Sequence, residues 1–248
     1  MLIDYQHVNV YQEDVCVLND VTFQIEEGEF VYIIGKVGSG KSSLLKTLYC
    51  EVDLDKDEAE KADVLGRDLL KIRRRDIPSL RKEMGIIFQD FQLLHDRSVR
   101  KNLEFVLRAT GWKNKKEIAA RIEEVLIEVG LYDKLEKMPH ELSGGEQQRI
   151  AIARAILNQP KIIIADEPTG NLDMETACNI VRLLKEITQT GTAVIMSTHN
   201  FPLLDQYPGI VYECKEQAIT DVTDNYNHVS LRDDDDESHE SVDLGEDA

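Results

Sequence analysis

The chain has 248 residues, of which 42% are hydrophobic, enough for one sizeable α/β domain with a smaller lobe. Its formal net charge of −18 argues against a nucleic-acid partner, because the phosphates of nucleic acid repel an acidic protein. The longest apolar runs fall well short of the ~20 residues that cross a bilayer, and Met1–Val10 lacks the basic start and apolar block of a signal peptide. The four cysteines are scattered without a CxxC pair, which predicts a reduced cytosolic protein without structural zinc.

The first strand expected here, Phe30–Ile34, leads into a loop that matches the phosphate-binding pattern G-x-x-x-x-G-K-[ST]. The residues of this loop are Gly35, Lys36, Val37, Gly38, Ser39, Gly40, Lys41 and Ser42. Its glycines allow backbone amides to wrap phosphate oxygens, and the helix expected next points its positive dipole end at the same anion. Lys41 is expected to bridge the β- and γ-phosphates and Ser42 to ligate Mg²⁺. A glycine-rich turn without a ligand would not require Lys and Ser at this spacing.

Further runs of strand length follow along the chain, at Gly85–Phe88, Lys161–Ala165 and Thr192–Ser197. Their alternation with helical segments predicts a largely parallel sheet with right-handed crossovers. Polar residues end these runs, namely Gln89, Asp166 and His199. Because ligands of open α/β sheets lie beyond the carboxyl ends of strands, we expect these polar residues to converge on the glycine loop.

The apolar spacing becomes helical between Gln89 and Lys161. The positions that define it are Ile118, Ile122, Val125, Leu126 and Val129, and Gly130 supplies a stop. The simplest architecture is a helical lobe, residues 90–159, inserted between two parts of a sheet core, residues 1–89 and 160–220.

The stretch 142–149, Leu-Ser-Gly-Gly-Glu-Gln-Gln-Arg, is the most specific in the chain. Ser143 and Glu146 have the spacing of a capping box that begins a helix. Capping does not explain Gly144 and Gly145, because glycines in the first turn lower helix stability. Bare backbone amides at a helix start suit the close approach of a further phosphate.

Two adjacent carboxylates, Asp166 and Glu167, follow the expected strand Lys161–Ala165. Asp166 is expected to orient the water shell of the metal, and Glu167 to polarise the attacking water. An isolated Asp-Glu pair at a strand end is commonly only solvated, so this pair gains its meaning from the phosphate loop.

Residues 221–248 contain 11 acidic residues and one basic residue, Arg232. A run such as Asp233–Glu237, with few apolar neighbours, buries too little surface to offset the entropy of ordering it. The segment is therefore predicted to be a mostly disordered acidic tail.

Over about residues 1–220 the chain resembles the nucleotide-binding domain of ABC transporters. The motifs stand in the family's order: the phosphate loop, Gln89, the LSGGEQQR signature, Asp166 and Glu167, Asn171–Asp173, and His199. The resemblance implies an α/β fold of the P-loop, RecA-like type, with a mostly parallel sheet core, an antiparallel N-terminal β part and an inserted helical lobe. It also implies ATP and Mg²⁺ as ligands, and a second copy of the chain as a head-to-tail partner in hydrolysis.

Roles for single residues around the bound nucleotide follow from the same resemblance. Tyr11 would stack on adenine, Gln89 would touch Mg²⁺ while sensing a membrane partner, and Ser43 keeps a hydroxyl where Thr is common in the family. The metal set is then Ser42, Gln89 and Asp166. Read alone, Tyr11 also suits a core position.

Further roles concern catalysis and the second copy. Ser143 and Gly145, with Gly144 between them, would contact the γ-phosphate held by the opposite subunit, and Asp173 would communicate across the dimer. His199 would contact the γ-phosphate and hold Glu167 in place, which makes Glu167, His199 and Lys41 the catalytic residues. Without its motif neighbours, His199 would read as an ordinary buried histidine.

Within the family, the stretches 88–94 and 96–99 resemble the cell-division subfamily FtsE. This implies an FtsX-like transmembrane permease as partner, a peripheral position on the cytoplasmic face of the inner membrane, and control of cell-wall hydrolases. The run 165–173 is shared with lipoprotein-releasing and macrolide-exporting transporters, which form the alternative. Residues 51–63, with seven acids and two lysines, replace a turn that contains Pro and Gly in the family.

Other classes of ATPase share the phosphate loop and the signature. DNA-repair and chromosome ATPases interpose a long coiled coil between the two motifs, whereas the roughly one hundred residues here show no sustained heptads. Ribosome-acting ABC proteins carry two cassettes in one chain, and this chain has one. A scaffold that does not hydrolyse ATP would not need Lys41, Asp166, Glu167 and His199 together.

Overall fold

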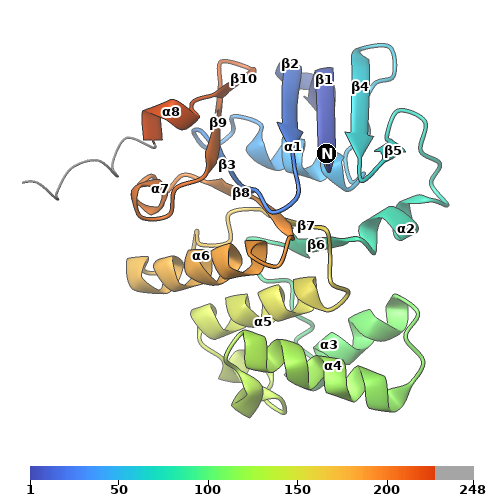
Figure 1. Cartoon of the computed structure of the whole chain (residues 1–248), viewed down its shortest axis with the longest axis vertical. Helices are drawn as coiled ribbons and strands as arrows, with labels where there is room; N and C mark the ends of the chain where they lie inside the picture. The colour runs from blue at the N-terminus through green and yellow to red at the C-terminus, as the bar shows by residue number, and fades with distance from the viewer. Residues whose placement is uncertain (227–248) are drawn as a thin grey trace, which may run out of the picture.

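The structure is a computed structural model that describes residues 1–226, and they form two sheets covered by helices (Figure 1). The first sheet is antiparallel with the order β2-β1-β4-β5. Its strands are β1 (Ile3–Gln12), β2 (Val15–Ile25), β4 (Ala59–Val64) and β5 (Arg67–Asp68). Residues 59–63 of the acidic stretch 51–63 thus belong to strand β4, which pairs antiparallel with β1.

The second sheet has the order β10-β9-β3-β8-β7-β6. Its strands are β3 (Phe30–Ile34), β6 (Met84–Ile87), β7 (Ile162–Ala165), β8 (Ala193–Thr198), β9 (Ile210–Lys215) and β10 (Ala218–Asp221). All neighbours are parallel except β10, which returns antiparallel to β9. The predicted fold class, a mostly parallel sheet with an antiparallel N-terminal part, is confirmed.

Buried strands of this sheet divide their side chains between two cores. In β3, Val31 and Ile33 face the core shared with the antiparallel sheet, whereas Phe30, Tyr32 and Ile34 face the helices. Because side chains alternate along a strand, a strand covered on both faces needs an unbroken apolar run. The same reason explains why β7 and β8 are fully buried.

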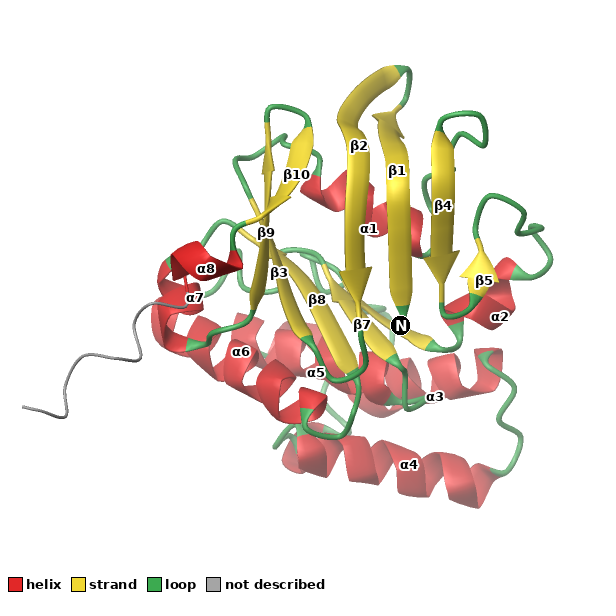
Figure 2. Cartoon of the chain, turned by 45° about the horizontal axis from the view of Figure 1, so that its top comes forward, coloured by secondary structure: helices red, strands yellow, loops and turns green. Residues whose placement is uncertain are grey.

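Figure 2 shows the antiparallel sheet on one side of the parallel sheet and the longer helices on the other. The helices are α1 (Lys41–Leu48), α2 (Ile77–Arg81), α3 (Val99–Ala109), α4 (Lys115–Glu128), α5 (Gly144–Ile156), α6 (Met174–Thr188), α7 (Pro202–Gln206) and α8 (Thr223–Tyr226), with short 3-10 turns at Tyr132–Lys134 and Pro139–Glu141. No described helix is long and apolar enough to span a membrane.

The helices inserted between β6 and β7 are α3, α4 and α5. The predicted helical positions fall in α4, where Ile118, Ile122, Val125 and Leu126 are buried, and Gly130 follows with a positive φ of 71°. Helix α5 packs on strand β6 as well as on its helical neighbours. A Cβ atom on Gly85 would lie 2.8 Å from the carbonyl oxygen of Ala155, so glycine allows this close approach.

The described fold continues beyond the predicted boundary at residue 220. Strand β10 ends at Asp221, and α8 follows it. Its last residue, Tyr226, stacks on Phe201 with ring centroids 6.4 Å apart. Among the first six residues of the predicted acidic tail, all but Val222 therefore lie in a strand or a helix, and the rest of that tail, 227–248, lies outside the described residues.

Candidate functional site

The glycine loop lies between the buried strand β3 and helix α1, the order that the sequence predicts. Gly35 has φ 144°, and a Cβ there would lie 2.4 Å from the carbonyl oxygen of Cys214. Gly40 precedes α1 with φ 93°, a conformation that side chains disfavour. Burial raises the pKa of the Cys214 thiol to about 12, so this cysteine stays neutral beside the loop.

Lys41, the first residue of α1, is buried and its ammonium group is held by the loop itself. Its Nζ donates to the carbonyl oxygens of Gly35 at 2.9 Å and Lys36 at 3.0 Å. The same atom lies 3.9 Å from Oε1 of Glu167. The loop therefore presents a fixed positive charge beside a carboxylate, and Ser42 and Ser43 follow in the first turn of α1.

The hydroxyl of Ser39 is a candidate ligand for an anion. Its Oγ is buried and has no hydrogen-bond partner in the described part of the chain, a state that normally costs free energy. A Cβ on the neighbouring Gly38 would meet nothing within 4 Å. An orphaned donor next to open space, at the start of a helix, fits a phosphate oxygen.

Asp166 follows strand β7 and gathers hydroxyl groups from two other elements. Its Oδ1 accepts from Ser42 Oγ on α1 at 2.9 Å and from Ser197 Oγ on β8 at 2.6 Å. Carboxylate and hydroxyl oxygens are ligands that Mg²⁺ prefers. No group of three or more His, Cys, Asp or Glu side chains that would hold a metal ion by themselves occurs in residues 1–226.

Glu167 has an unusual backbone and three neighbours. Its φ is 44°, a left-handed value that is strained for a residue with a side chain. Its backbone N–H donates to Ser197 Oγ at 2.8 Å, and its Oε2 lies 3.1 Å from Nδ1 of His199. The Glu167 side chain is 14% exposed and that of His199 is 50% exposed, so the reading of His199 as an ordinary buried histidine is wrong.

Gln89, which follows β6, completes the convergence at this edge of the sheet. A Cβ atom added to Gly170 would lie 3.7 Å from Gln89 Nε2 and 3.3 Å from Glu167 Oε2. A cavity of about 310 Å³ opens beside Glu167 and His199. The structure thus brings together the glycine loop, Gln89, Asp166, Glu167 and His199.

The signature segment makes local hydrogen bonds of its own. The predicted capping box is confirmed, since Ser143 Oγ accepts from the N–H of Glu146 at 3.3 Å and Glu146 accepts from the N–H of Ser143 at 2.8 Å. Within residues 1–226, no hydrogen bond or ion pair joins Ser143, Gly144 or Gly145 to the glycine loop. The described chain alone does not join the two phosphate-binding candidates by a hydrogen bond or an ion pair.

Two further candidates have local partners in the structure. Asp173 is the N-cap of α6, where its carboxylate accepts from the N–H and the hydroxyl of Thr176. Tyr11 is only half-buried and does not belong to either hydrophobic core, so the core reading of this residue is wrong. Its hydroxyl donates to Glu58, which raises the pKa of Tyr11 to about 12 and lowers that of Glu58.

Sequence reasoning missed Ser197, whose hydroxyl contacts both Asp166 and Glu167. The available signal was its polar side chain at a buried position of β8, two residues before His199. It also missed Glu58, which lies in the acidic stretch that departs from the family.

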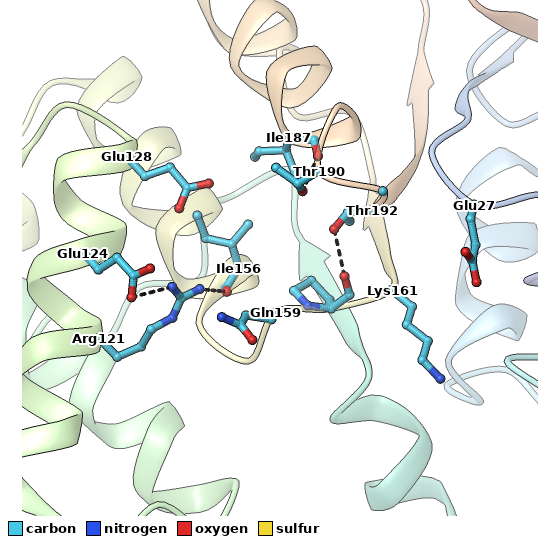
Figure 3. A pocket seen from close by; sticks show the side chains of 12 residues that line it. Glu27, Arg121, Glu124, Glu128, Ile156, Gln159, Lys161, Ile187, Thr190 and Thr192 are labelled. Carbon is cyan, nitrogen blue, oxygen red and sulfur yellow. Dashed lines mark hydrogen bonds and ion pairs between the residues drawn. The ribbon is translucent and has the colours of Figure 1, made fainter.

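A second cavity, of about 520 Å³, lies away from this site (Figure 3). In its lining, the Arg121 guanidinium contacts Glu124 at 2.8 Å and the carbonyl oxygen of Ile156 at 2.7 Å. Most of its other lining residues come from the segments that precede β7 and β8, and Glu27 and Glu128 complete the lining. It contains none of the candidate site residues.

Comparison with known proteins assigns the class. A family model described as "ABC transporter" matches residues 18–170. The solved structure of cbiO1 from Clostridium perfringens, described as part of the ABC transporter complex cbiONQ, superposes with a TM-score of 0.80 at 28% identity over 88% of this chain and 86% of that one. The chain belongs to the ABC transporter family, and it is an ABC-type ATPase with a P-loop fold.

The curated relatives are more specific. The cell division ATP-binding protein FtsE of Streptococcus pneumoniae is 44% identical over 198 residues, which cover 80% of this chain and 84% of that protein. FtsE of Escherichia coli K12 is 40% identical over 206 residues, 83% of this chain and 91% of that protein. The solved dimeric structure of MJ0796, described as a bacterial ABC transporter cassette, is 31% identical in sequence. It superposes with a TM-score of 0.77 over 88% of this chain and 96% of that one.

Proposed function

We propose that the glycine loop binds the phosphates of ATP and that Mg²⁺ is held at the neighbouring strand ends. The orphaned Ser39 hydroxyl and the buried Lys41 ammonium support the phosphate assignment. Ser42 and Asp166, already joined by a hydrogen bond of 2.9 Å, would hold the metal together with Gln89. The ion would neutralise negative charge on the phosphates. Tyr11 would then stack on adenine at the far end of the nucleotide.

Glu167 is the proposed general base for the attacking water. The observation that carries this proposal is the position of its carboxylate, 3.9 Å from Lys41 Nζ and 3.1 Å from His199 Nδ1. Glu167 is held in place by these contacts and by Ser197 at its backbone, so it meets the requirement for a fixed base. His199 would hold the carboxylate and contact the γ-phosphate.

Completion of the site is proposed to need a second copy of the chain. Ser143, Gly144 and Gly145 lie at the start of α5, and among residues 1–226 no hydrogen bond or ion pair joins them to their own glycine loop. Head-to-tail pairing would place them on the γ-phosphate of the other copy, with Asp173 near the shared interface. A relative whose structure is described as a dimeric post-hydrolysis state bound to ADP and Pi supports this arrangement.

The proposed cellular role is that of the FtsE relatives, cell division. The ATPase would drive or gate an FtsX-like permease and so regulate cell-wall hydrolases from the cytoplasmic face of the inner membrane. The length of the match, 80% of this chain and 84% of the relative, supports a shared role for the whole cassette.

Replacing Glu167 by Gln tests the catalytic proposal. The variant should keep ATP binding but lose about 10²–10⁴-fold in kcat, the usual contribution of a general base. It should also accumulate as an ATP-bound dimer on size-exclusion chromatography, because the closed state is no longer resolved by hydrolysis. The matched control is Glu117→Gln, which changes a carboxylate in the first turn of α4. Wild-type turnover in Glu167→Gln would rule out Glu167 as the base.

A further inference from the structure

The loop after Gln89 has a strained backbone. Phe91 has φ 60° and Gln92 has φ 47°, so two consecutive residues with side chains are left-handed. Such residues are unfavourable singly and persist only where their surroundings hold them. The loop's own hydrogen bonds are short-range, from the N–H of Phe91 to the Phe88 carbonyl and from the N–H of Gln92 to the Asp90 carbonyl. They do not by themselves explain why the pair stays left-handed.

One arginine from another element holds both strained residues. Arg154, in the last turn of α5, donates from Nη1 to the carbonyl oxygen of Gln92 at 2.6 Å and from Nη2 to that of Phe91 at 2.9 Å. Its guanidinium also lies 6.0 Å from the centre of the Phe88 ring. The planar fork of arginine suits two adjacent acceptors, and bonds from a charged donor are stronger than neutral ones.

The far end of the loop is fixed separately. Asn102 of α3 accepts from the N–H of Leu94 at 2.8 Å and donates to its carbonyl at 3.0 Å. The near end continues from β6, which is paired with β7. Between these anchors, Arg154 is the only side chain from outside the loop that bonds the Phe91 and Gln92 carbonyls within residues 1–226.

We propose that Arg154 is a positioning residue that keeps the Phe91–Gln92 pair left-handed and thereby fixes Gln89 beside Glu167 and Gly170. The helix that carries Arg154 begins at the signature residue Ser143, so the position of Gln89 is tied to that of the signature. Arg154 touches neither nucleotide nor metal in this assignment. The expected effect of Arg154 on ATP hydrolysis rests on the proposed role of Gln89 at Mg²⁺. The expected effect of Arg154 on the conformation of the loop does not depend on that role.

The hold on the loop is measured first, in nucleotide-free protein. Arg154→Ala should speed hydrogen exchange of the backbone amides in residues 89–93, while the amides of α5 stay protected. Arg108→Ala, an arginine on α3 that pairs with Glu104, is the matched control and should leave exchange in the loop unchanged. Unchanged exchange in Arg154→Ala would overturn the proposal, whatever Gln89 does.

Rescue by glycine separates positioning from general packing. Glycine adopts φ near 50° without a side-chain penalty, although it adds backbone freedom, so Gln92→Gly should restore part of the protection from exchange in the Arg154→Ala background. ATPase activity gives the second readout: Arg154→Ala should raise the Mg²⁺ concentration for half-maximal rate by about tenfold, as loss of charge-assisted bonds implies, and the double variant should recover most of it.

Two negative results would contradict different roles, one that of Arg154 and the other that of Gln89. If the double variant behaves like Arg154→Ala in both readouts, Arg154 acts through packing and the proposal is wrong. If Gln89→Ala itself leaves the Mg²⁺ dependence unchanged, the proposed role of Gln89 at the metal fails, while the exchange result still decides the role of Arg154.

Discussion

At the residue scale, the carboxylates that end β7 depend on a serine that belongs to β8. The hydroxyl of Ser197 accepts from the N–H of Glu167 and donates to Asp166. The same hydroxyl therefore stabilises the left-handed backbone of Glu167 and orients the Asp166 carboxylate of the proposed metal site. A single hydroxyl links the geometry of the base to that of the metal ligands.

Replacing Ser197 by Ala tests this link. Because the residue is fully buried, its loss leaves the Glu167 N–H unsatisfied, and we expect the free energy of unfolding to fall by about 1–3 kcal/mol. A shift of the base by even a small distance should lower kcat by roughly tenfold, which corresponds to about 1.4 kcal/mol in the barrier. Denaturant unfolding and steady-state ATPase assays measure the two effects. Ser79→Ala, at an exposed position, is the control, and equal kcat in both variants would contradict the argument.

Asp4 joins three strands of the antiparallel sheet through its carboxylate. It accepts from Lys61 of β4 at 2.5 Å, from Gln6 of its own strand at 3.0 Å and from Gln24 of β2 at 3.1 Å. The hydrogen bond with Lys61, more than any other contact, lowers the pKa of Asp4 to about 2. A depressed folded-state pKa stabilises the protein above the unfolded pKa of roughly 4, and that contribution is lost as pH falls through about 2.

The stability of the protein should therefore depend on pH through the Asp4–Lys61 pair. Lys61→Met should lower the free energy of unfolding at pH 6 and have a much smaller effect near pH 2, where Asp4 is increasingly protonated in both proteins. Urea unfolding at the two pH values gives the difference directly. Lys56→Met, an exposed lysine in the preceding loop, should show no such pH dependence. An equal loss at both pH values would mean that Lys61 acts through packing.

At the scale of elements, α5 approaches α6 closely at the signature. A Cβ on Gly145 would lie 2.6 Å from Cγ2 of Thr176. The glycine therefore has a packing reason in addition to the proposed approach of a phosphate. The packing role and the proposed phosphate-binding role of Gly145 can be tested separately, because Thr176→Ser removes Cγ2 and keeps the hydroxyl that bonds Asp173.

Gly145→Ala should destabilise the protein by about 1–3 kcal/mol through overpacking. Adding Thr176→Ser should restore most of that stability. If the glycine also serves a phosphate of the second copy, the double variant should fold normally and still hydrolyse ATP slowly. The single variant Thr176→Ser is the control for both assays. Full recovery of ATPase activity in the double variant would show that packing alone requires the glycine.

The parts of the fold that followed from the sequence are those with strong local signals. Helix α4 is amphipathic and ends before a glycine, and β3, β7 and β8 are continuous apolar runs because both of their faces are covered. The antiparallel N-terminal sheet was expected only from the family resemblance. The left-handed pair Phe91–Gln92 had no local signal, since its conformation depends on Arg154, sixty-odd residues later in the chain.

The site shows the same division. The glycine loop has a fixed residue spacing, and the polar residues Gln89, Asp166 and His199 follow predicted strands. Because ligands of open α/β sheets lie beyond the carboxyl ends of the strands, the convergence of these residues was predictable. Ser197 and Glu58 act through tertiary contacts, and the sequence offers no spacing that links either of them to its partner.

At the scale of the whole molecule, the surface beside Gln89 is where we expect the proposed permease to dock. The sequence groups Phe91, Leu93 and Leu94 next to basic residues, but the structure assigns them different places. Leu93 is buried in the core and Phe91 is packed against it. Leu94 is 37% exposed and Phe105 of α3 is 51% exposed.

The guanidinium of Arg97, which donates to both carboxylate oxygens of the exposed Asp96, lies 5.4 Å from the centre of the exposed Phe105 ring. Exposed apolar side chains beside a positive charge suit a short cytoplasmic helix of a permease, with the apolar groups as anchors and the charge setting orientation. Such a partner, seated next to the loop that carries Gln89, would bias closure only through different contacts with the open and closed states.

We therefore expect Leu94→Asp and Phe105→Asp each to weaken co-purification with an FtsX-like permease while ATP binding by the isolated protein stays unchanged. An added carboxylate in an apolar contact is costly to bury, so the effect should exceed that of Leu94→Ala. Ile127→Asp is the matched control, because Ile127 is also an exposed apolar residue, at 65%, on α4, a different helix of the insert. If all three Asp variants retain the permease at the wild-type level, the docking surface lies elsewhere. If Ile127→Asp weakens binding as much as the other two, the loss reflects added negative charge and the assignment of this surface fails.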